Sequence, residues 1–308
     1  MTPGPGGGDF ICGDWGTSRL RLFRCGGGAV LARREGPGIA EAGGCAAEIF
    51  AKLTADWPTD LPAILSGMVG SSIGWREAAY CACPAAPQTI ARAALRFEAP
   101  TSDSNARRIA IVPGLSCTNA SGLFDVLRGE ETQLLGALRL RPELARGRHL
   151  FCLPGTHAKW TLIENGTVVR FQTALSGELF ALLSRHSVLA RGAGEASPAH
   201  PAFAAGVAAA RESAGLLHLL FSTRSRQLAG EIAREEAASY LSGLIVGTEV
   251  AAALRLFPAD GPVVLVCTPA LAALYEAVLR EHERQAVAVD GDAAVLAGLC
   301  FLHSQLFG

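Results

Sequence analysis

The stretch Phe10–Arg24, FICGDWGTSRLRLFR, decides the fold. Phe10–Cys12 is a short apolar run, and Arg19–Leu22 alternates polar and apolar side chains, the pattern of a half-buried strand. Gly13–Ser18, between them, carries two glycines, two hydroxyls and a carboxylate. Glycines let backbone N–H groups approach an anion, hydroxyls donate further hydrogen bonds, and Asp14 is a ligand type that Mg²⁺ accepts. The stretch predicts strand, phosphate-binding turn and strand, or else a hairpin that merely needs its glycines.

Two familiar phosphate motifs are excluded for this turn. A Walker A loop needs Gly-Lys-Ser/Thr, and a dinucleotide-binding fingerprint needs the turn to open a helix. Here Arg19–Leu22 predicts a strand instead.

A second stretch of the same kind lies near the middle of the chain, at His149–Thr173. The turn Pro154–Lys159 is followed by the predicted strand Trp160–Ile163, by Asn165-Gly166, which is a strong hairpin signal, and by the returning strand Thr167–Phe171. Both turns contain a Gly-Thr pair. Either two glycine-bearing hairpins coincide, or the chain contains a duplicated half, with a cleft that grips phosphates from both sides.

Composition bounds the class of protein. The chain has 308 residues, 50% apolar and 18% charged, with a net charge of −1, which suits two domains of ordinary size and no nucleic-acid partner. Nine cysteines without a CxxC pair predict free, mostly buried thiols in a reducing cytoplasm. The first ten residues predict a flexible leader and not a signal peptide. Glu249 and Arg255 interrupt the most apolar run, Leu244–Leu256, so no membrane span or membrane partner is expected.

Two further segments are candidates for binding and catalysis. Ser66–Trp75 follows a short buried strand, and its serines and tryptophan suit a sugar-like substrate as well as a closely packed loop. In Asp125–Gln133, DVLRGEETQ, Glu130 and Glu131 fall in the first turn of a predicted helix, where the helix dipole favours carboxylates. One of them, or Asp125, is alternatively a base that accepts a proton from an attacking hydroxyl.

The C-terminal part is mainly helical. Gly243 and Gly247 lie one turn apart in an alanine-rich helix and allow close approach of either a flat group such as adenine or another helix. Thr268 follows a strand and precedes a helix, and a final helix is predicted at Ala293–Leu306.

Taken together, these stretches resemble the sugar kinase/actin-like ATPase superfamily and, more closely, the 2-dehydro-3-deoxygalactonokinase family. The segments that match are DWGTS at 14–18, SGMVGS at 66–71 with Gly74-Trp75, VPG at 112–114, DVLRGEETQ at 125–133, LPGTHAKW at 153–160 and SGELF at 176–180. They are distributed over most of the first 190 residues; Cys267 stands where many relatives carry a glycine near the adenosine.

The resemblance implies an α/β fold of two ribonuclease-H-like, actin-like ATPase domains with an ATP cleft between them. Residues 1–140 would form the N-terminal domain and 141–308 the C-terminal domain. The last helix would pack back on the N-terminal domain. The implied reaction is ATP-dependent phosphorylation of the 6-hydroxyl of 2-dehydro-3-deoxy-D-galactonate in galactonate catabolism, with Mg²⁺. The enzyme would be cytoplasmic, and a homodimer is one assembly that the sequence allows.

The resemblance also implies roles for residues. Catalysis would use Asp14, which also holds the metal, Lys159 against a phosphate or carboxylate, and Glu130 or Glu131. ATP would contact Gly16, Thr17, Ser18, Gly155, Thr156 and His157. Gly243, Gly247 and Thr268 are our own candidates for the adenosine side, apart from the resemblance. The substrate would contact Ser66, Gly67, Met68, Gly70, Ser71, Trp75 and Arg128, with Arg19 and Arg185 as other candidates for its carboxylate.

Two rival interpretations stay open. One is a kinase for another sugar, against which the Ser66–Trp75 loop and DVLRGEETQ argue, or for another sugar acid such as the gluconate epimer, which stays open. The other is an actin-like ATPase module that needs no small-molecule acceptor.

Overall fold

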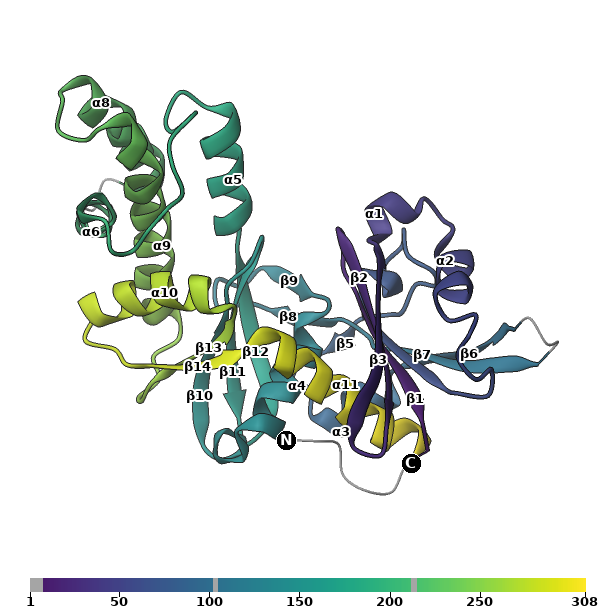
Figure 1. The fold of residues 1–308 in the computed structure, drawn as a ribbon. Coiled ribbons are helices and arrows are strands. Elements are labelled where there is room, and N and C mark those ends of the chain that lie inside the picture. The colour runs from purple at the N-terminus through teal and green to yellow at the C-terminus, as the bar shows by residue number, and fades with distance from the viewer. Residues whose placement is uncertain (1–7, 102–104, 212–214) are drawn as a thin grey trace. The chain divides into compact units, whose positions relative to one another are not determined.

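The computed structural model describes residues 8–101, 105–211 and 215–308 (Figure 1). Most of the predicted leader therefore lies outside the described residues. The chain forms two compact units. The first comprises Met1–Gly147, Ile163–Arg170 and Gly291–Gly308, and the second comprises Arg148–Leu162 and Phe171–Asp290.

A six-stranded sheet organises the first unit, in the order β3-β2-β1-β4-β7-β6. The strands are β1 (Phe10–Trp15), β2 (Arg19–Gly26), β3 (Ala29–Pro37), β4 (Ala63–Gly67), β6 (Leu95–Pro100) and β7 (Ala106–Ile111). The β1–β2–β3 pairs are antiparallel, whereas β1, β4 and β7 run parallel, so the sheet is mixed.

Side-chain alternation gives this sheet two different faces. Ile11, Trp15 and Leu22 belong to the core that packs against α1 (Ile39–Ala42) and α2 (Ala46–Leu53). Residues of the opposite parity on β1 and β2 face α11 (Gly291–Phe307), where the ring of Phe10 stacks on His303 at 3.7 Å between centroids.

Helix α11 also packs closely on α4 (Glu130–Leu140), as Figure 1 shows. Gly136 and Gly298 make this contact, since a Cβ at either position would lie within 2 Å of a backbone oxygen on the other helix. The chain reaches α4 through α3 (Pro87–Arg92) and a small sheet of β5 (Cys81–Ala82), β8 (Leu115–Thr118) and β9 (Phe124–Leu127).

The five-stranded sheet of the second half repeats the arrangement, in the order β12-β11-β10-β13-β14. Its strands are β10 (Arg148–Leu153), β11 (Ala158–Glu164), β12 (Thr167–Ala174), β13 (Val263–Cys267) and β14 (Ala286–Asp290). The tip of the β11–β12 hairpin, Ile163–Arg170, belongs to the first unit. Asn165 and Gly166 have φ of 47° and 74°, as the predicted Asn-Gly hairpin turn requires. The mixed sheets confirm the predicted α/β class.

Helices make up the rest of the second unit. They are α5 (Ser176–His186), α6 (Pro201–Ala209), α7 (Leu216–Leu220), α8 (Ser222–Leu228), α9 (Ala237–Leu256) and α10 (Pro269–Glu281). The segment Arg234–Leu256 is long and apolar enough to cross a membrane, but 78% of its apolar window is buried within the protein. It packs against α5, α6 and α10, which is the arrangement of a core helix.

The predicted first turn is too long. Gly13, Asp14 and Trp15 continue strand β1, because Gly13 is packed between Leu22 and Leu65 and the buried Trp15 indole donates to Pro37 O at 3.0 Å. The turn shortens to Gly16–Ser18. All nine cysteines are free thiols and six are buried, as predicted.

Candidate functional site

The first turn presents exposed hydrogen-bond donors. Gly16 N donates to Arg19 O at 2.9 Å and closes the turn, whereas Thr17 and Ser18 are exposed. In the part of the chain that the structure describes, the backbone N–H groups of Thr17 and Ser18 donate to no protein acceptor. Two unsatisfied amides and two hydroxyls in one exposed turn form a suitable environment for an anion.

The turn is supported from behind by the start of α1. Ile39 N donates to Gly16 O and Ala40 N donates to Thr17 O, both at 3.0 Å. Gly38 makes this approach feasible, since a Cβ there would lie 2.2 Å from Thr17 O. The helix start therefore fixes the backbone of the turn.

The second turn is built in the same way. Gly155, Thr156 and His157 are exposed, and Glu178 N donates to Thr156 O at 2.9 Å from the first turn of α5. Gly177 packs against the turn as Gly38 does, since a Cβ there would lie 2.2 Å from Gly155 O. In both copies the packing glycine lies 22 residues after the turn glycine (38 − 16 and 177 − 155). This equal spacing favours duplication over coincidence.

Gly177→Ala is expected to destabilise the protein by about 1–3 kcal/mol, because the added methyl must displace the backbone of the second turn. Gly155→Ala is the matched control, since its Cβ would meet no heavy atom within 4 Å. Thermal unfolding should show a lower Tm for Gly177→Ala alone. Equal Tm values for the two variants would contradict the packing role of Gly177.

A buried carboxylate holds the region behind the second turn. Glu249 of α9 accepts from Trp160 Nε1 at 2.7 Å, and the Tyr275 hydroxyl lies 2.9 and 3.0 Å from its two oxygens. Burial raises the pKa of Glu249. Hydrogen bonds oppose this rise, and the one from Ser176 at the start of α5 has the largest lowering effect on the pKa. Glu249 therefore connects β11, α5 and α10.

Asp14 takes part in an ion-pair chain. Arg21 Nη2 lies 2.5 Å from Asp14 Oδ2, and Arg21 Nη1 also contacts Asp292 at the start of α11. The Arg21 side chain is 8% exposed, Asp14 22% and Asp292 65%. Asp14 thus remains reachable from solvent at the end of β1, beside the first turn.

The predicted substrate loop is partly buried. Ser66 is fully buried and its hydroxyl lies 3.3 Å from the Thr132 hydroxyl. Gly67 has φ of +91° and packs against Trp15 O, and Gly70 is buried beside Ile111 and Arg128. The structure therefore assigns these three positions to packing around β4.

The outer part of the loop is more open. Met68 and Ser71 are half-buried, and the Ser71 hydroxyl donates to Met68 O at 2.7 Å. Trp75 packs on Phe50 and Phe97, at 5.4 and 5.3 Å between centroids, and lines a cavity of about 460 Å³ beside α2. Of the ten loop residues only Trp75 lines this cavity, so the loop does not converge on it.

Arg128 is an unsatisfied cation next to the loop. Its Nη2 donates to Ala78 O at 2.8 Å, and its guanidinium lies 4.4 Å from the centre of the Tyr80 ring. Nε and Nη1 are buried and have no hydrogen-bond partner among the described residues. Buried N–H donors without acceptors are costly, and an anionic ligand would satisfy them. Arg19 and Arg185 are exposed instead.

Glu130 and Glu131 differ sharply in environment. Glu130 is half-buried and accepts from Arg128 N at 3.0 Å. Glu131 is fully buried: Oε2 accepts from Gly129 N at 2.6 Å, while Oε1 has no partner in the described residues. Burial, and then the charge of Glu130, raise the pKa of Glu131 to about 8. A buried carboxyl with a free acceptor atom and a pKa near neutrality is typical of a catalytic acid or base.

The pKa of Glu131 predicts a pH-dependent loss of stability. Above about pH 4.5 the unfolded chain releases this proton, whereas the folded chain retains it until about pH 8, so stability falls as pH rises across this window. Glu131→Gln removes the effect. The free energy of unfolding of Glu131→Gln minus that of the wild type should therefore be larger at pH 8 than at pH 5 by a few kcal/mol. Denaturant unfolding at both pH values measures the gain, and a constant difference would contradict the buried carboxyl.

Other predicted residues lie in different surroundings. Lys159 is buried, with Nζ donating to the Thr173 hydroxyl at 2.8 Å. His157 Nε2 lies 2.6 Å from Glu178 Oε2 on the exposed surface of the second turn. Thr268 is exposed at the start of α10, directly after strand β13. Asp125 lies in β9 and accepts from Val126 N at 2.8 Å.

Gly243 and Gly247 serve helix packing. A Cβ at Gly243 would lie 2.1 Å from Phe203 O, and one at Gly247 would lie 2.8 Å from the Ala210 side chain. Both glycines are buried against α6 and its C-terminal end. Close approach of another helix, one of the two alternatives for their spacing, accounts for both glycines.

Sequence reasoning missed several residues that shape the site. They are Gly38, Gly177, Arg21, Asp292 and Glu249. The two glycines had a usable signal, which is their equal distance from the Gly-Thr pairs. The lone carboxylate of an apolar helix was a signal for Glu249, but its three partners come from separate segments.

Comparison with known proteins matches this chain to one family. The family model described as 2-keto-3-deoxy-galactonokinase matches residues 14–302. The chain is 40% identical, over 95% of both chains, to a Rhizobium meliloti (strain 1021) protein named probable 2-dehydro-3-deoxygalactonokinase. It is 33% identical to the 2-dehydro-3-deoxygalactonokinase of Escherichia coli (strain K12), over 94% of this chain and 96% of the relative.

A solved structure shares the whole fold. A crystal structure from Sinorhizobium meliloti, assigned to 2-dehydro-3-deoxygalactonokinase, superposes with a TM-score of 0.88 at 37% identity and covers 97% of this chain and 99% of its own. The family predicted from the sequence is therefore confirmed. Since the matched region runs from Asp14 in β1 to Leu302 in the last helix, the chain belongs to the 2-keto-3-deoxy-galactonokinase family.

Proposed function

We propose that this protein transfers the γ-phosphoryl group of ATP to the 6-hydroxyl of 2-dehydro-3-deoxy-D-galactonate, within galactonate catabolism in the cytoplasm. The observation that carries the proposal is the pair of exposed turns, each with a Gly-Thr pair and each packed from behind by a glycine and a helix N–H group, in a chain of this family. The phosphates of ATP are the anions that such turns suit.

Each turn is assigned phosphate contacts of its own. In the first, Thr17 and Ser18 offer their amides and hydroxyls beside Gly16. In the second, the exposed residues are Gly155, Thr156 with its hydroxyl, and His157 with its ring. Thr268, exposed where β13 ends and α10 begins, is the remaining candidate for the adenosine side. Lys159 is buried against Thr173, so its proposed contribution is to the charge near the second turn and not to direct contact.

Asp14 fits a Mg²⁺ ion that enters with ATP. Its carboxylate is partly exposed beside the first turn, and Mg²⁺ commonly binds through one or two carboxylates while keeping several waters. Bound there, Mg²⁺ would neutralise charge on the transferred phosphoryl group. Arg21 holds the Asp14 carboxylate in place from the protein side.

Glu131 is assigned the base, and Arg128 the substrate carboxylate. The free, buried Oε1 of Glu131 is an acceptor that the 6-hydroxyl proton would satisfy. The free Nε and Nη1 of Arg128 are donors that a carboxylate would satisfy. Met68 and Ser71, at the outer part of the loop, complete the proposed substrate contacts.

Arg128→Met is expected to raise KM for the sugar acid by about 10–100-fold, since hydrogen bonds to a charged group contribute roughly 1.5–3 kcal/mol. KM for ATP should not change. The methyl ester of the substrate supplies the control, because the wild type should prefer the acid and the variant should not. A folded variant with unchanged preference for the acid would remove Arg128 from the contact.

The function is tested by ADP release with Mg²⁺ and three conditions: the galactonate-derived acid, its gluconate epimer, and no acceptor. Strong preference for the galactonate form supports the proposal. Equal use of both epimers would broaden the substrate, and turnover independent of any acceptor would favour the ATPase alternative.

A further inference from the structure

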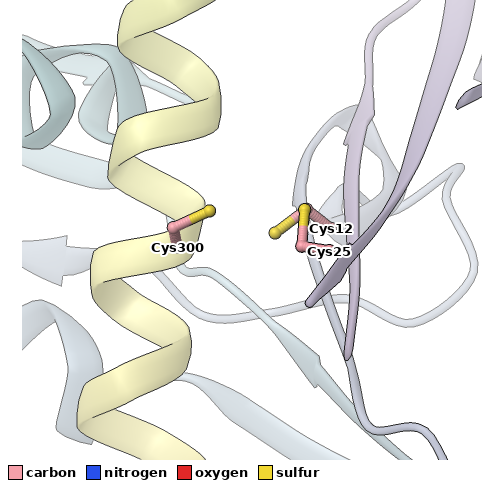
Figure 2. A group of neighbouring side chains, drawn as sticks. All are labelled: Cys12, Cys25 and Cys300. Atoms are coloured by element: carbon pink, nitrogen blue, oxygen red, sulfur yellow. The ribbon is translucent and has the colours of Figure 1, made fainter. Parts of the chain in front are cut away.

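Three cysteines from distant parts of the sequence meet inside the first unit. Cys12 lies on β1, Cys25 on β2 and Cys300 on α11, and their sulfur atoms all lie within 4.8 Å of one another. Figure 2 shows the Cys300 sulfur directed from the helix towards the sulfurs of the two strand residues. None of the three takes part in the proposed phosphoryl transfer.

The sheet register explains why these thiols converge. Phe10 pairs with Cys25 and Cys12 pairs with Phe23 across the antiparallel β1–β2 ladder, so Cys12 and Cys25 are diagonal neighbours on one face. The same face lies against α11, where Phe10 stacks on His303, one turn after Cys300. The register of the sheet and the phase of the helix thus bring three sulfurs together.

We propose that Cys12, Cys25 and Cys300 form a binding site for one soft metal ion of the Zn²⁺ or Cu⁺ type. Sulfur ligands select such ions over Mg²⁺ or Ca²⁺, which prefer oxygen. Three sulfurs at about 2.3 Å from one ion lie about 4 Å apart. The three sulfurs already lie within 4.8 Å of one another. Small rotations of the side chains are enough to bring them to the distances that one ion requires.

The surroundings of the cluster suit this ion. Cys12 and Cys25 are fully buried, while Cys300 is half-buried and gives the side from which an ion would enter. Hydrogen bonds from Cys12 and Cys25 lower the pKa of the Cys300 thiol, whereas burial raises the pKa of the Cys12 thiol, so a bound ion would have to displace the Cys12 proton. Nε2 of the buried His303, one helical turn after Cys300, has no hydrogen-bond partner in the described ranges.

Binding is balanced by proton release. Each thiol that ligates the ion loses its proton to solvent, no electrons are transferred, and the three Cys–metal bonds replace the S–H bonds and metal-bound waters. The bound ion would join β1 and β2, which lead into the first turn, to α11. Loaded protein should therefore unfold at a higher temperature than metal-free protein.

The test uses the full chain, reduced with a phosphine under anaerobic conditions, and Cd²⁺ as the probe. Cd²⁺ bound by thiolates gives ultraviolet charge-transfer absorption, whereas Zn²⁺ is silent but should compete. We expect one equivalent to bind and to raise Tm. Cys300→Ala should weaken binding by about 100-fold or more and abolish the Tm shift.

Two controls keep the result interpretable. Cys45→Ala removes the exposed cysteine of the chain and should leave the titration unchanged. Cys25→Ser, which keeps a similar volume, should lose the absorption as Cys300→Ala does, and the Tm of each metal-free variant reports folding. No absorption in the wild type, or the same titration in Cys300→Ala, would overturn the proposal. The assay needs neither ATP nor sugar acid, so it is independent of the proposed function.

Discussion

Glu131→Gln is expected to lower kcat by about 10²–10⁴-fold, the usual contribution of a general base. Glutamine keeps the size of the side chain and can still accept from Gly129 N, as Glu131 Oε2 does at 2.6 Å. It cannot take a proton from an attacking hydroxyl. KM for ATP should stay near the wild-type value, because the lost group acts on the acceptor. Steady-state kinetics with ATP and the sugar acid varied in turn measures both parameters.

Glu130→Gln is the matched control for this experiment. Glu130 is adjacent but half-buried, and its carboxylate accepts from Arg128 N. We expect a smaller loss than for Glu131→Gln. The assignment would be contradicted if Glu131→Gln were fully active and the large loss of kcat appeared in Glu130→Gln or Asp125→Asn instead.

The pH profile gives an independent check on the same group. A base works in its deprotonated form, so kcat/KM of the wild type should rise with pH and level off above an inflection near pH 8. Glu131→Gln should lack this inflection. The same buried carboxyl lowers stability over this pH range, so the site exchanges stability for activity.

Asp14→Asn is expected to lower kcat by about 10²–10³-fold, the loss seen when one group that stabilises transition-state charge is removed. The amide cannot bind Mg²⁺ as the carboxylate does, so the Mg²⁺ concentration needed for half-maximal activity should also rise. A titration of activity against Mg²⁺ measures both effects.

Asp292→Asn separates a metal role from mere positioning of Arg21. Asp14 and Asp292 both contact Arg21, but Asp292 is 65% exposed at the start of α11. Its replacement should change kcat by only a small factor and leave the Mg²⁺ requirement unchanged. Similar losses in the two variants would mean that Asp14 acts only through Arg21.

Local signals in the sequence were sufficient to find both turns. The Gly-Thr pairs, the Asn165-Gly166 hairpin and the alternating strand after the first turn depend on neighbouring residues, and the structure contains all of them. The error at Gly13–Trp15 has the same origin. Gly-Asp is a turn signal locally, but burial of Trp15 and packing of Gly13 between two leucines extend the strand.

Long-range packing was not accessible from the chain alone. The spacing of Gly243 and Gly247 suits a flat ligand or a helix equally, and only the tertiary structure shows that α6 packs against both. The Arg21–Asp292 pair joins residues 271 positions apart, and the difference between Glu130 and Glu131 depends on which one the fold buries. The sequence alone identified which carboxylates and glycines are candidates. Their burial in the fold determines the electrostatic environment of each one.

The central claim is transfer of phosphate to a sugar acid, and the most direct test is the identity of the product. The protein should be incubated with ATP, Mg²⁺ and 2-dehydro-3-deoxygalactonate, and the product examined by phosphorus and proton NMR. We predict one phosphorylated acid per ADP, with the phosphorus coupled to the protons at carbon 6. ADP with free phosphate and an unchanged acid would contradict the account.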